Sequence, residues 1–169
     1  MTKKCVSLFS NTGFGDIGMH KAGIQTIVAN ELLKDRAEIF QKNFHETKVL
    51  CGDIWELQNE IIKSALTILN GERLYAMIVS CPCQAMSSNG MGRMTSAIKQ
   101  NKRQKDDPRN RLILPAIEII EKLSPVCVII ENVSGMRHTC ILNENDEYEK
   151  ILSILYRRLP NYVFRSCVL

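Results

Sequence analysis

The chain has 169 residues, which are enough for one domain with a hydrophobic core and too few for two. Hydrophobic residues make up 45% of it, and 22 basic against 18 acidic residues leave a net charge of +4. This is the composition of an ordinary soluble protein, and so small a net charge says little about partners. Lys3 and Lys4 lead directly into a strand-like segment, so we expect no signal peptide, and no apolar run approaches membrane-spanning length, so we expect no membrane partner.

Seven cysteines are scattered through the chain, an odd number, and most lie in apolar segments. This usage favours a reduced, cytoplasmic compartment over a disulfide framework. Cys81 and Cys83 form the only close pair, and no second pair or histidine cluster completes a set of four ligands. We therefore expect no metal site.

Strand and helix signals alternate along the chain. In chain order, the predicted elements are a strand at 5–9, a helix at 13–22, a strand at 26–29, a helix at 34–43, a strand at 48–51, a helix at 54–69, a strand at 74–79, a loop at 85–106, a helix at 112–123 that Pro115 kinks or starts, a strand at 126–130, a helix at 146–158 and a strand at 162–169. This order predicts an α/β protein of the doubly wound, Rossmann-like kind, with six mostly parallel strands and helices on both faces.

Polar residues follow the ends of the first three predicted strands. A glycine-containing turn at 9–15 leads into the first helix, where backbone can approach a ligand and helix N–H groups are free. Glu31 follows the second strand, where an acid typically accepts hydrogen bonds from ribose hydroxyls, and Asp53 follows the third, where it could accept from an adenine amino group. Singly, these acids could be helix caps or surface charges. Together they predict a nucleoside pocket.

Two more polar strings follow the fourth and fifth strands. They are Pro82-Cys83-Gln84 and Glu131-Asn132-Val133. Because residues just past the carboxyl ends of parallel strands converge on one crevice, we expect a thiol and a carboxyl to meet there. That pair suits covalent attack by sulfur on a ring that an acid activates. The alternative for Cys83 is a small buried hydrophobe, the usual fate of a free cysteine.

The segment 93–111 is basic. It carries Arg93, Lys99, Lys102, Arg103, Lys105, Arg109 and Arg111 against Asp106 and Asp107. Such a segment can neutralise phosphates, and it can equally be a solvated loop.

The ordered set of motifs resembles a known family. The strings are Leu8-Phe9-Ser10 with Gly13 and Gly18, Asn30-Glu31, Gly52-Asp53-Ile54, Pro82-Cys83-Gln84, Asp107-Pro108-Arg109-Asn110-Arg111-Leu112 and Glu131-Asn132-Val133. In this order and on these strand ends they resemble the amino-terminal part of a cytosine-5 DNA methyltransferase, over nearly the whole chain.

The resemblance implies S-adenosyl-L-methionine as the cofactor. Phe9 would pack on the adenine, Glu31 would hold the ribose, and Asp53 would accept from the adenine amino group with Ile54 alongside. The full set of cofactor-binding residues expected from the resemblance is Phe9, Ser10, Gly13, Glu31, Asp53, Ile54 and Leu112, with Leu112 on the methionine side.

The resemblance also implies the chemistry. A thiolate from Cys83 adds to carbon 6 of a cytosine flipped out of double-stranded DNA, and Glu131 stabilises the charge through ring N3. Carbon 5 then takes the methyl group, a base removes its proton and the sulfur leaves. Asn132 would orient the loop that carries Cys83. The residues expected to face the DNA are Pro82, Gln84, Ser87 and Arg93. The resemblance further implies a role in restriction-modification, in the cytoplasm of a bacterial or phage-infected cell, and leaves a paired restriction nuclease open.

The chain departs from the family pattern in two places near its start. Asn11 and Phe14 stand where glycine is usual; Asn tolerates left-handed backbone, whereas Phe14 could narrow the cofactor pocket. Cys81 stands at a usual proline and is interpreted as structural.

A larger departure lies at the carboxyl end of the pattern. After the last predicted strand, the resemblance implies a Gln-x-Arg-x-Arg motif, a seventh strand and a target-recognition domain, none of which occurs in the 169 residues. We therefore expect 1–169 to be a partial catalytic domain: a fragment, a truncated product, or one subunit of a split enzyme completed by a C-terminal partner. An inactive relic with weak cofactor or DNA binding is the alternative. A dinucleotide oxidoreductase would explain the first turn and Glu31 but has no use for Cys83 with Glu131.

Overall fold

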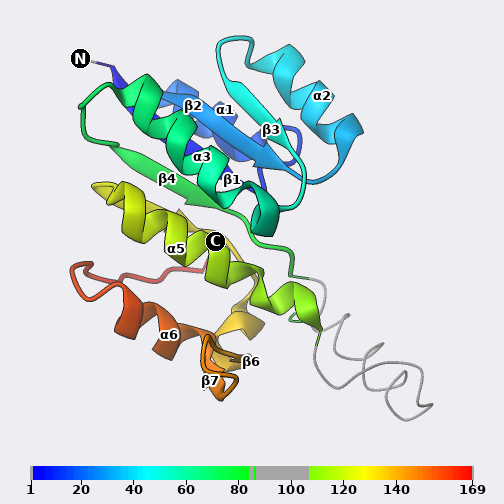
Figure 1. Ribbon diagram of the computed structural model, residues 1–169, viewed down its shortest axis with the longest axis vertical. Helices are drawn as coiled ribbons and strands as arrows, with labels where there is room; N and C mark the ends of the chain where they lie inside the picture. Colours follow the sequence, from blue (N-terminus) through cyan, green and yellow to red (C-terminus); the bar gives the residue numbers. More distant parts are fainter. Residues whose placement is uncertain (1, 84–85, 87–106, 169) are drawn as a thin grey trace. The chain divides into compact units, whose positions relative to one another are not determined.

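The computed structural model describes residues 2–83, 86 and 107–168 (Figure 1). The chain divides into two compact units. Unit 1 consists of Met1–Cys81 with Glu118–Glu131, and unit 2 consists of Pro82–Ile117 with Asn132–Leu169. The helix α5 (Ile113–Leu123) has residues in both units.

Unit 1 is built on a parallel sheet. Its five strands in the described residues are β1 (Lys3–Leu8), β2 (Ile24–Glu31), β3 (Lys48–Cys51), β4 (Ala76–Val79) and β5 (Cys127–Ile130), arranged in the order β3-β2-β1-β4-β5. All four neighbouring pairs are parallel. The chain order reverses direction beside β1, and this reversal is typical of a doubly wound fold.

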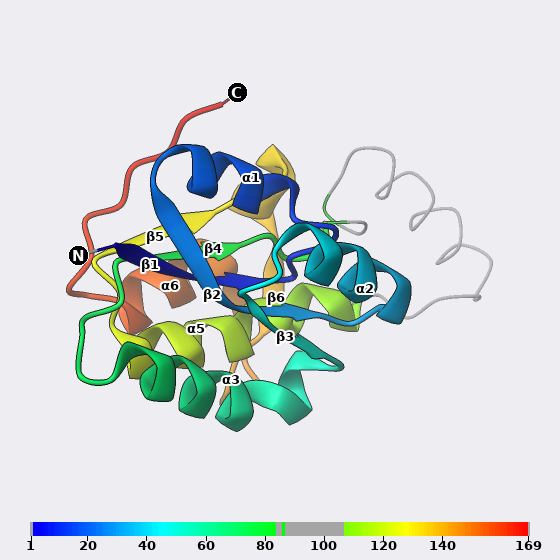
Figure 2. The same cartoon turned by 90° about the horizontal axis from the view of Figure 1, so that it is seen from above.

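Three helices cover the sheet of unit 1. They are α1 (Phe14–Lys21), α2 (Lys34–Asn43) and α3 (Ile54–Leu69). Figure 2 shows α1 and α2 on one face of the sheet and α3 on the other. This arrangement follows from right-handed crossovers, because the chain moves outward through α1 and α2 and returns through α3. The predicted doubly wound α/β fold is confirmed.

Local sequence signals explain why α3 begins and ends where it does. The Asp53 side chain accepts a hydrogen bond from the Trp55 N–H at 2.9 Å, which caps the helix. Ile54, Ile61 and Ala65 are buried along one face. Asn70 takes a left-handed backbone with φ 46° and ends the helix.

The pairing of β1 with β2 contains an irregularity. Cys5 lies opposite Thr26, yet the next residue, Val6, lies opposite Val28, so that Ile27 is an extra residue on β2. Such a bulge shifts every later side chain of β2 to the other face of the sheet.

Unit 2 contains short elements. They are the 3-10 helices η1 (Pro108–Leu112) and η2 (Ser134–His138), an antiparallel hairpin of β6 (Cys140–Leu142) and β7 (Tyr148–Lys150), and α6 (Ile151–Arg158). The helix α6 packs on η2 and β7, and its residues Ile151, Ile154 and Leu155 are buried. Arg157 pairs with Glu144 at 2.6 Å and with Glu149 at 2.8 Å.

Two sequence predictions in this unit are wrong. The predicted strand at 162–169 is not formed, since 162–168 has no regular secondary structure, so the parallel sheet of the described residues has five strands and not six. An alternating apolar pattern cannot by itself supply the neighbouring strand that backbone groups need. The segment is instead held by an edge-on contact of Phe164 with Tyr156, at 4.6 Å between ring centroids, and by Arg137 Nη2 donating to Ser166 Oγ at 3.3 Å.

The last helix also begins later than the predicted residue 146. Asn143 Oδ1 accepts the N–H groups of Asn145 and Glu147, at 2.9 and 3.0 Å, and this side-chain turn closes the β6–β7 hairpin. Tyr148–Lys150 therefore pairs with β6 before the helix starts. The predicted loop at 85–106 lies outside the described residues except for Met86. No helix among the described residues is long and apolar enough to cross a bilayer.

Candidate functional site

The turn after β1 has an unusual backbone. Phe9 and Asn11 take positive φ angles of 56° and 52°, and Gly13 takes 94°. The Ser10 N–H donates to the Asn30 carbonyl at 3.0 Å, and the Gly13 N–H donates to the Ser10 carbonyl at 3.0 Å. Gly13 has no room for a side chain, because a Cβ there would collide with the Phe44 ring. A left-handed backbone costs an aromatic residue such as Phe9 about 1–2 kcal/mol. Residues strained in this way cluster at ligand sites.

Glu31 lies at the end of β2 and is only 6% exposed. Its Oε2 accepts the Asn11 N–H at 2.9 Å, and its Oε1 accepts the Leu33 N–H at 2.9 Å. A carboxylate has about four acceptor positions, so these two bonds fix the group and leave capacity for two hydroxyl donors. The donor set of a ribose therefore fits Glu31. Asn11, which stands where glycine is usual in the family, adopts a left-handed backbone, a conformation that asparagine tolerates.

Asp53 and Ile54 follow β3. Asp53 is exposed and already caps α3 through one oxygen, a bond that uses part of its acceptor capacity. Ile54 is 2% exposed and belongs to the core. Trp55, beside them, is 43% exposed. The motifs did not predict Trp55 as a site residue, although an exposed tryptophan close to a strand-end acid is a signal of a binding site.

Phe14 begins α1 and is 78% exposed. Phe9 is half-buried, whereas Ser10 is buried and its Oγ donates to the Asn30 carbonyl at 3.2 Å. The residues of unit 1 that are expected to bind the cofactor thus lie at the carboxyl ends of three adjacent strands. Leu112, expected on the methionine side, belongs to unit 2.

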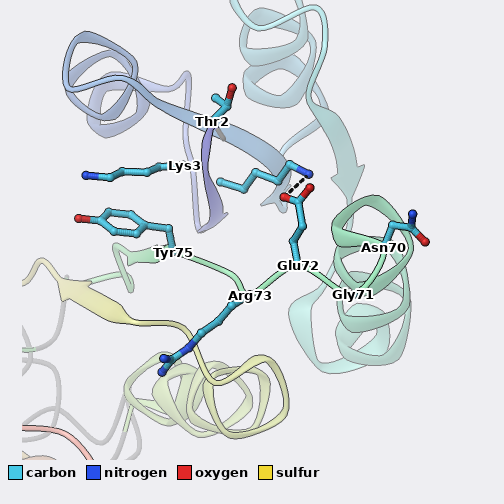
Figure 3. Close-up of a pocket in the computed structure, with 8 residues that line it drawn as sticks. Thr2, Lys3, Asn70, Gly71, Glu72, Arg73 and Tyr75 are labelled. Carbon is cyan, nitrogen blue, oxygen red and sulfur yellow. Dashed lines mark ion pairs between the residues drawn. The ribbon is translucent and has the colours of Figure 1, made fainter.

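A pocket of about 590 Å³ lies at the opposite, amino-terminal ends of the strands (Figure 3). It is lined by Thr2, Lys3, Lys4, Asn70, Gly71, Glu72, Arg73 and Tyr75. Lys4 pairs with Glu72 at 2.9 Å, and the Lys3 ammonium lies 4.5 Å from the centroid of the Tyr75 ring. Both lysines therefore have partners within the pocket, which is separate from the strand ends that carry Glu31 and Asp53.

Unit 2 holds the Cys83 turn. The Met86 N–H donates to the Cys83 carbonyl at 2.9 Å, and Met86 is 2% exposed while Cys83 is half-buried. Gly135, in the segment that follows Glu131-Asn132-Val133, approaches this turn so closely that a Cβ would collide with the Met86 carbonyl oxygen. Asn132 Oδ1 accepts the Val133 N–H at 2.9 Å. The segment after β5 and the turn that carries Cys83 thus meet within unit 2.

Sequence reasoning missed Gly135 and Met86. Gly135 lies two residues beyond the Glu131-Asn132-Val133 string, and a glycine at such a place is a signal of close backbone approach. Glu131 itself is exposed and belongs to unit 1, where its N–H donates to the Val79 carbonyl at 3.0 Å.

Cys81 differs from Cys83. It is 6% exposed, and burial raises the pKa of its thiol, so the group stays protonated. This agrees with a structural role for Cys81.

The string 107–112 forms η1. Asp107 caps it by accepting the Arg109 N–H at 3.0 Å, and the Arg109 guanidinium donates to both carboxylate oxygens at 2.9 and 2.5 Å. The Asp107 carboxylate raises the pKa of Arg109. Asn110 Oδ1 and Arg111 Nε are buried and have no hydrogen-bond partner among the described residues.

The sequence-predicted residues fall into three groups. Phe9, Ser10, Gly13, Glu31, Asp53, Ile54 and Glu131 lie in unit 1, and Pro82, Cys83, Leu112 and Asn132 lie in unit 2. Gln84, Ser87 and Arg93 lie outside the described residues. In the described part of the chain, no group of three His, Cys, Asp or Glu side chains could hold a metal ion.

A family model described as C-5 cytosine-specific DNA methylase matches residues 3–156. The chain belongs to this family. Curated relatives agree. It is 39% identical over 130 residues to the type II methyltransferase M1.HgaI of Avibacterium volantium, and 35% identical over 136 residues to M.AquIA of Picosynechococcus. These matches cover 76% and 80% of this chain but 34% and 50% of those relatives. The chain therefore spans between one third and one half of their length.

Solved structures support the fold. A DNA modification methyltransferase encoded within an Escherichia coli prophage matches with a TM-score of 0.67 and 23% identity, over 94% of this chain and 38% of that one. DNMT2 of Spodoptera frugiperda matches with a TM-score of 0.59 and 21% identity, over 94% of this chain and 40% of that one. The fold of this chain, including its parallel sheet, is therefore the fold of these solved methyltransferases.

Proposed function

We propose that this chain supplies the cofactor-binding and nucleophile portion of an S-adenosylmethionine-dependent DNA (cytosine-5-)-methyltransferase. Its substrate is double-stranded DNA, inside a bacterial or phage-infected cell. The remaining half to two thirds of the length seen in the relatives, on this or a second polypeptide, contributes target recognition. The proposal is carried by the close approach of Gly135 to Met86, which joins the segment after Glu131-Asn132 to the turn that carries Cys83.

Glu31 and Asp53 hold the cofactor in this proposal. Glu31 accepts from the ribose hydroxyls with the capacity that its two backbone bonds leave, and Asp53 accepts from the adenine amino group while it caps α3. Phe9, fixed in a strained backbone, packs on the base. When bound, the cofactor supplies an electrophilic methyl group.

The chemistry belongs to Cys83 and Glu131. The Cys83 thiol gives up its proton and bonds to carbon 6 of the flipped cytosine, because carbon 5 is a poor nucleophile until this addition makes the ring enamine-like. The thiolate is the attacking species, so loss of the thiol proton is coupled to attack. Glu131 holds a proton at ring N3 and neutralises the charge that develops there. Asn132 fixes the backbone between the acid and the Cys83 turn.

A trapping experiment tests this function. The chain is expressed with the carboxy-terminal half of a relative such as M1.HgaI, and mixed with randomised duplexes that contain 5-fluorocytosine and with S-adenosylmethionine. Because fluorine at carbon 5 cannot leave as a proton would, the cysteine adduct should persist and shift the protein on a denaturing gel. Absence of an adduct with the wild-type cysteine would contradict the proposed enzyme and favour an inactive binding module.

A further inference from the structure

Asp16 is a buried carboxyl that the proposed reaction does not use. It lies on α1 and is 1% exposed. Its Oδ1 accepts from Thr26 Oγ1 at 2.7 Å, and its Oδ2 accepts from Ser7 Oγ at 3.0 Å. Both hydroxyl residues are themselves buried, at 5% and 2% exposure. One carboxyl therefore ties α1 to both β1 and β2.

The Thr26 end of this cluster lies at the bulge of β2. Thr26 is the last residue before the extra Ile27, and its carbonyl accepts from Thr47 Oγ1 at 2.7 Å. The side chain and the carbonyl of Thr26 are thus held from two sides, by α1 and by the chain that enters β3. Hydrogen bonds to a fully buried carboxylate are among the stronger ones in proteins.

The bulge changes the face of the sheet on which Glu31 lies. Thr26 faces α1, and Glu31 is an odd number of positions further along β2, so in a regular strand of period two Glu31 would face away from α1. The extra residue reverses this relation. Ser7 then lies opposite Ala29, and Glu31, two residues further on, shares the α1 face and accepts the Asn11 N–H at 2.9 Å.

We propose that Asp16 is a positioning residue: through Thr26 it fixes the β2 bulge that turns Glu31 toward the glycine-rich turn, and so sets cofactor affinity. Only the effect on cofactor affinity rests on the proposed function; the effect on the position of Glu31 does not. Asp16 does not touch the cofactor and acts through Glu31.

The test compares Thr26→Val with Thr26→Ser in the full chain. Valine keeps the shape and strand propensity of threonine but removes the hydroxyl, whereas serine keeps the hydroxyl. Two readouts are measured in each variant: exchange of the Asn11 amide hydrogen by NMR, and affinity for S-adenosylhomocysteine by calorimetry. Thr67→Val is the matched control, since Thr67 Oγ1 donates within α3, to the Lys63 carbonyl at 2.8 Å.

We expect Thr26→Val to speed Asn11 amide exchange and weaken binding about tenfold, the effect of losing one hydrogen bond to a charged group. Thr26→Ser should restore both, and Thr67→Val should change neither. The proposal is overturned if Asn11 exchange in Thr26→Val equals that of the wild type, or if exchange rises equally at amides throughout the sheet, which is what general destabilisation would give.

A Glu31→Gln variant separates this inference from the proposed function. If Glu31→Gln leaves the affinity unchanged while Thr26→Val still frees the Asn11 amide, Asp16 positions Glu31 but Glu31 does not hold the cofactor. If Glu31→Gln weakens binding and Thr26→Val alters neither readout, the cofactor site stands and the role given to Asp16 is wrong.

Discussion

The glycine-rich turn of unit 1 and the Cys83 turn of unit 2 are built in different ways. The first is fixed by a buried carboxylate that accepts two backbone N–H groups, and by left-handed residues that only a well-determined surrounding can hold. The second rests on the hydrogen bond from Met86 to Cys83 and on the backbone approach of Gly135. The contacts that position Glu31 and those that position the Cys83 turn are therefore separate, so variants at the Cys83 turn should leave affinity for the expected cofactor unchanged.

The largest effect is expected from the nucleophile. Cys83→Ser should abolish transfer of labelled methyl groups to cytosine-containing duplexes, because a hydroxyl is a far poorer nucleophile than a thiolate at neutral pH. Affinity for S-adenosylhomocysteine should stay unchanged, since the contacts of Glu31 lie in unit 1. Cys167→Ser is the control at an exposed cysteine and should keep full transfer. Transfer that survives Cys83→Ser would show that another residue attacks the base.

Gly135→Ala should disrupt the turn that carries Cys83 and leave the proposed cofactor site intact. The added Cβ would meet the Met86 carbonyl oxygen, a backbone atom that cannot move aside cheaply, so we expect a cost of about 1–3 kcal/mol in unfolding free energy and a large loss of methyl transfer. Gly18→Ala is the matched control. Nothing lies within 4 Å of a Cβ at Gly18 in α1, and there alanine should stabilise by about 0.5–1 kcal/mol.

These two glycine variants are compared by urea unfolding and by the transfer assay. Normal transfer by Gly135→Ala would mean that the contact with Met86 has no part in placing Cys83.

Substitutions at Asp53 should separate capping from cofactor recognition. Asp53→Ala removes both the cap on the Trp55 N–H and the adenine contact, so the melting temperature and the affinity for S-adenosylhomocysteine should both fall, with about 1 kcal/mol lost from the cap. Asp53→Asn keeps a good cap but presents an amide N–H group to the adenine amino group. It should therefore keep the melting temperature and lose affinity. Calorimetry that finds wild-type affinity in both variants would place the adenine elsewhere.

The sequence predicted what depends on local signals and missed what depends on long-range contacts. Helix α3 and strand β3 match their predicted bounds to the residue, because Asp53 and Asn70 mark the helix ends. The strand expected at 162–169 failed, since its pattern carried no information about a neighbouring strand. Burial of Asp16 between two hydroxyls and the approach of Gly135 to Met86 join segments that are distant in sequence. The glycine at 135 signals a close backbone approach, but no local pattern identifies the segment that it meets.

The smallest effect concerns the pH dependence of unit 1. Burial raises the pKa of Asp16 in the folded chain, with the hydrogen bonds from Thr26 and Ser7 opposing this rise. A carboxyl whose folded pKa exceeds its unfolded value, about 3.9, binds its proton more tightly in the folded state. Its contribution to stability is therefore complete below the unfolded pKa and is lost as the pH rises through the folded pKa. The neighbouring Cys5 thiol stays neutral across this range, because burial and the nearby Asp16 raise its pKa to about 12.

Asp16→Asn removes this titration while keeping an oxygen that can accept from Thr26. The melting temperature of the wild type relative to Asp16→Asn should thus be highest below about pH 3.9, fall as the pH rises through the folded pKa of Asp16, and then become constant. Thermal unfolding of both proteins across this range, read by circular dichroism, measures the difference directly. A difference that rises with pH would mean that the Thr26 and Ser7 hydroxyls stabilise the charged carboxylate by more than burial disfavours it.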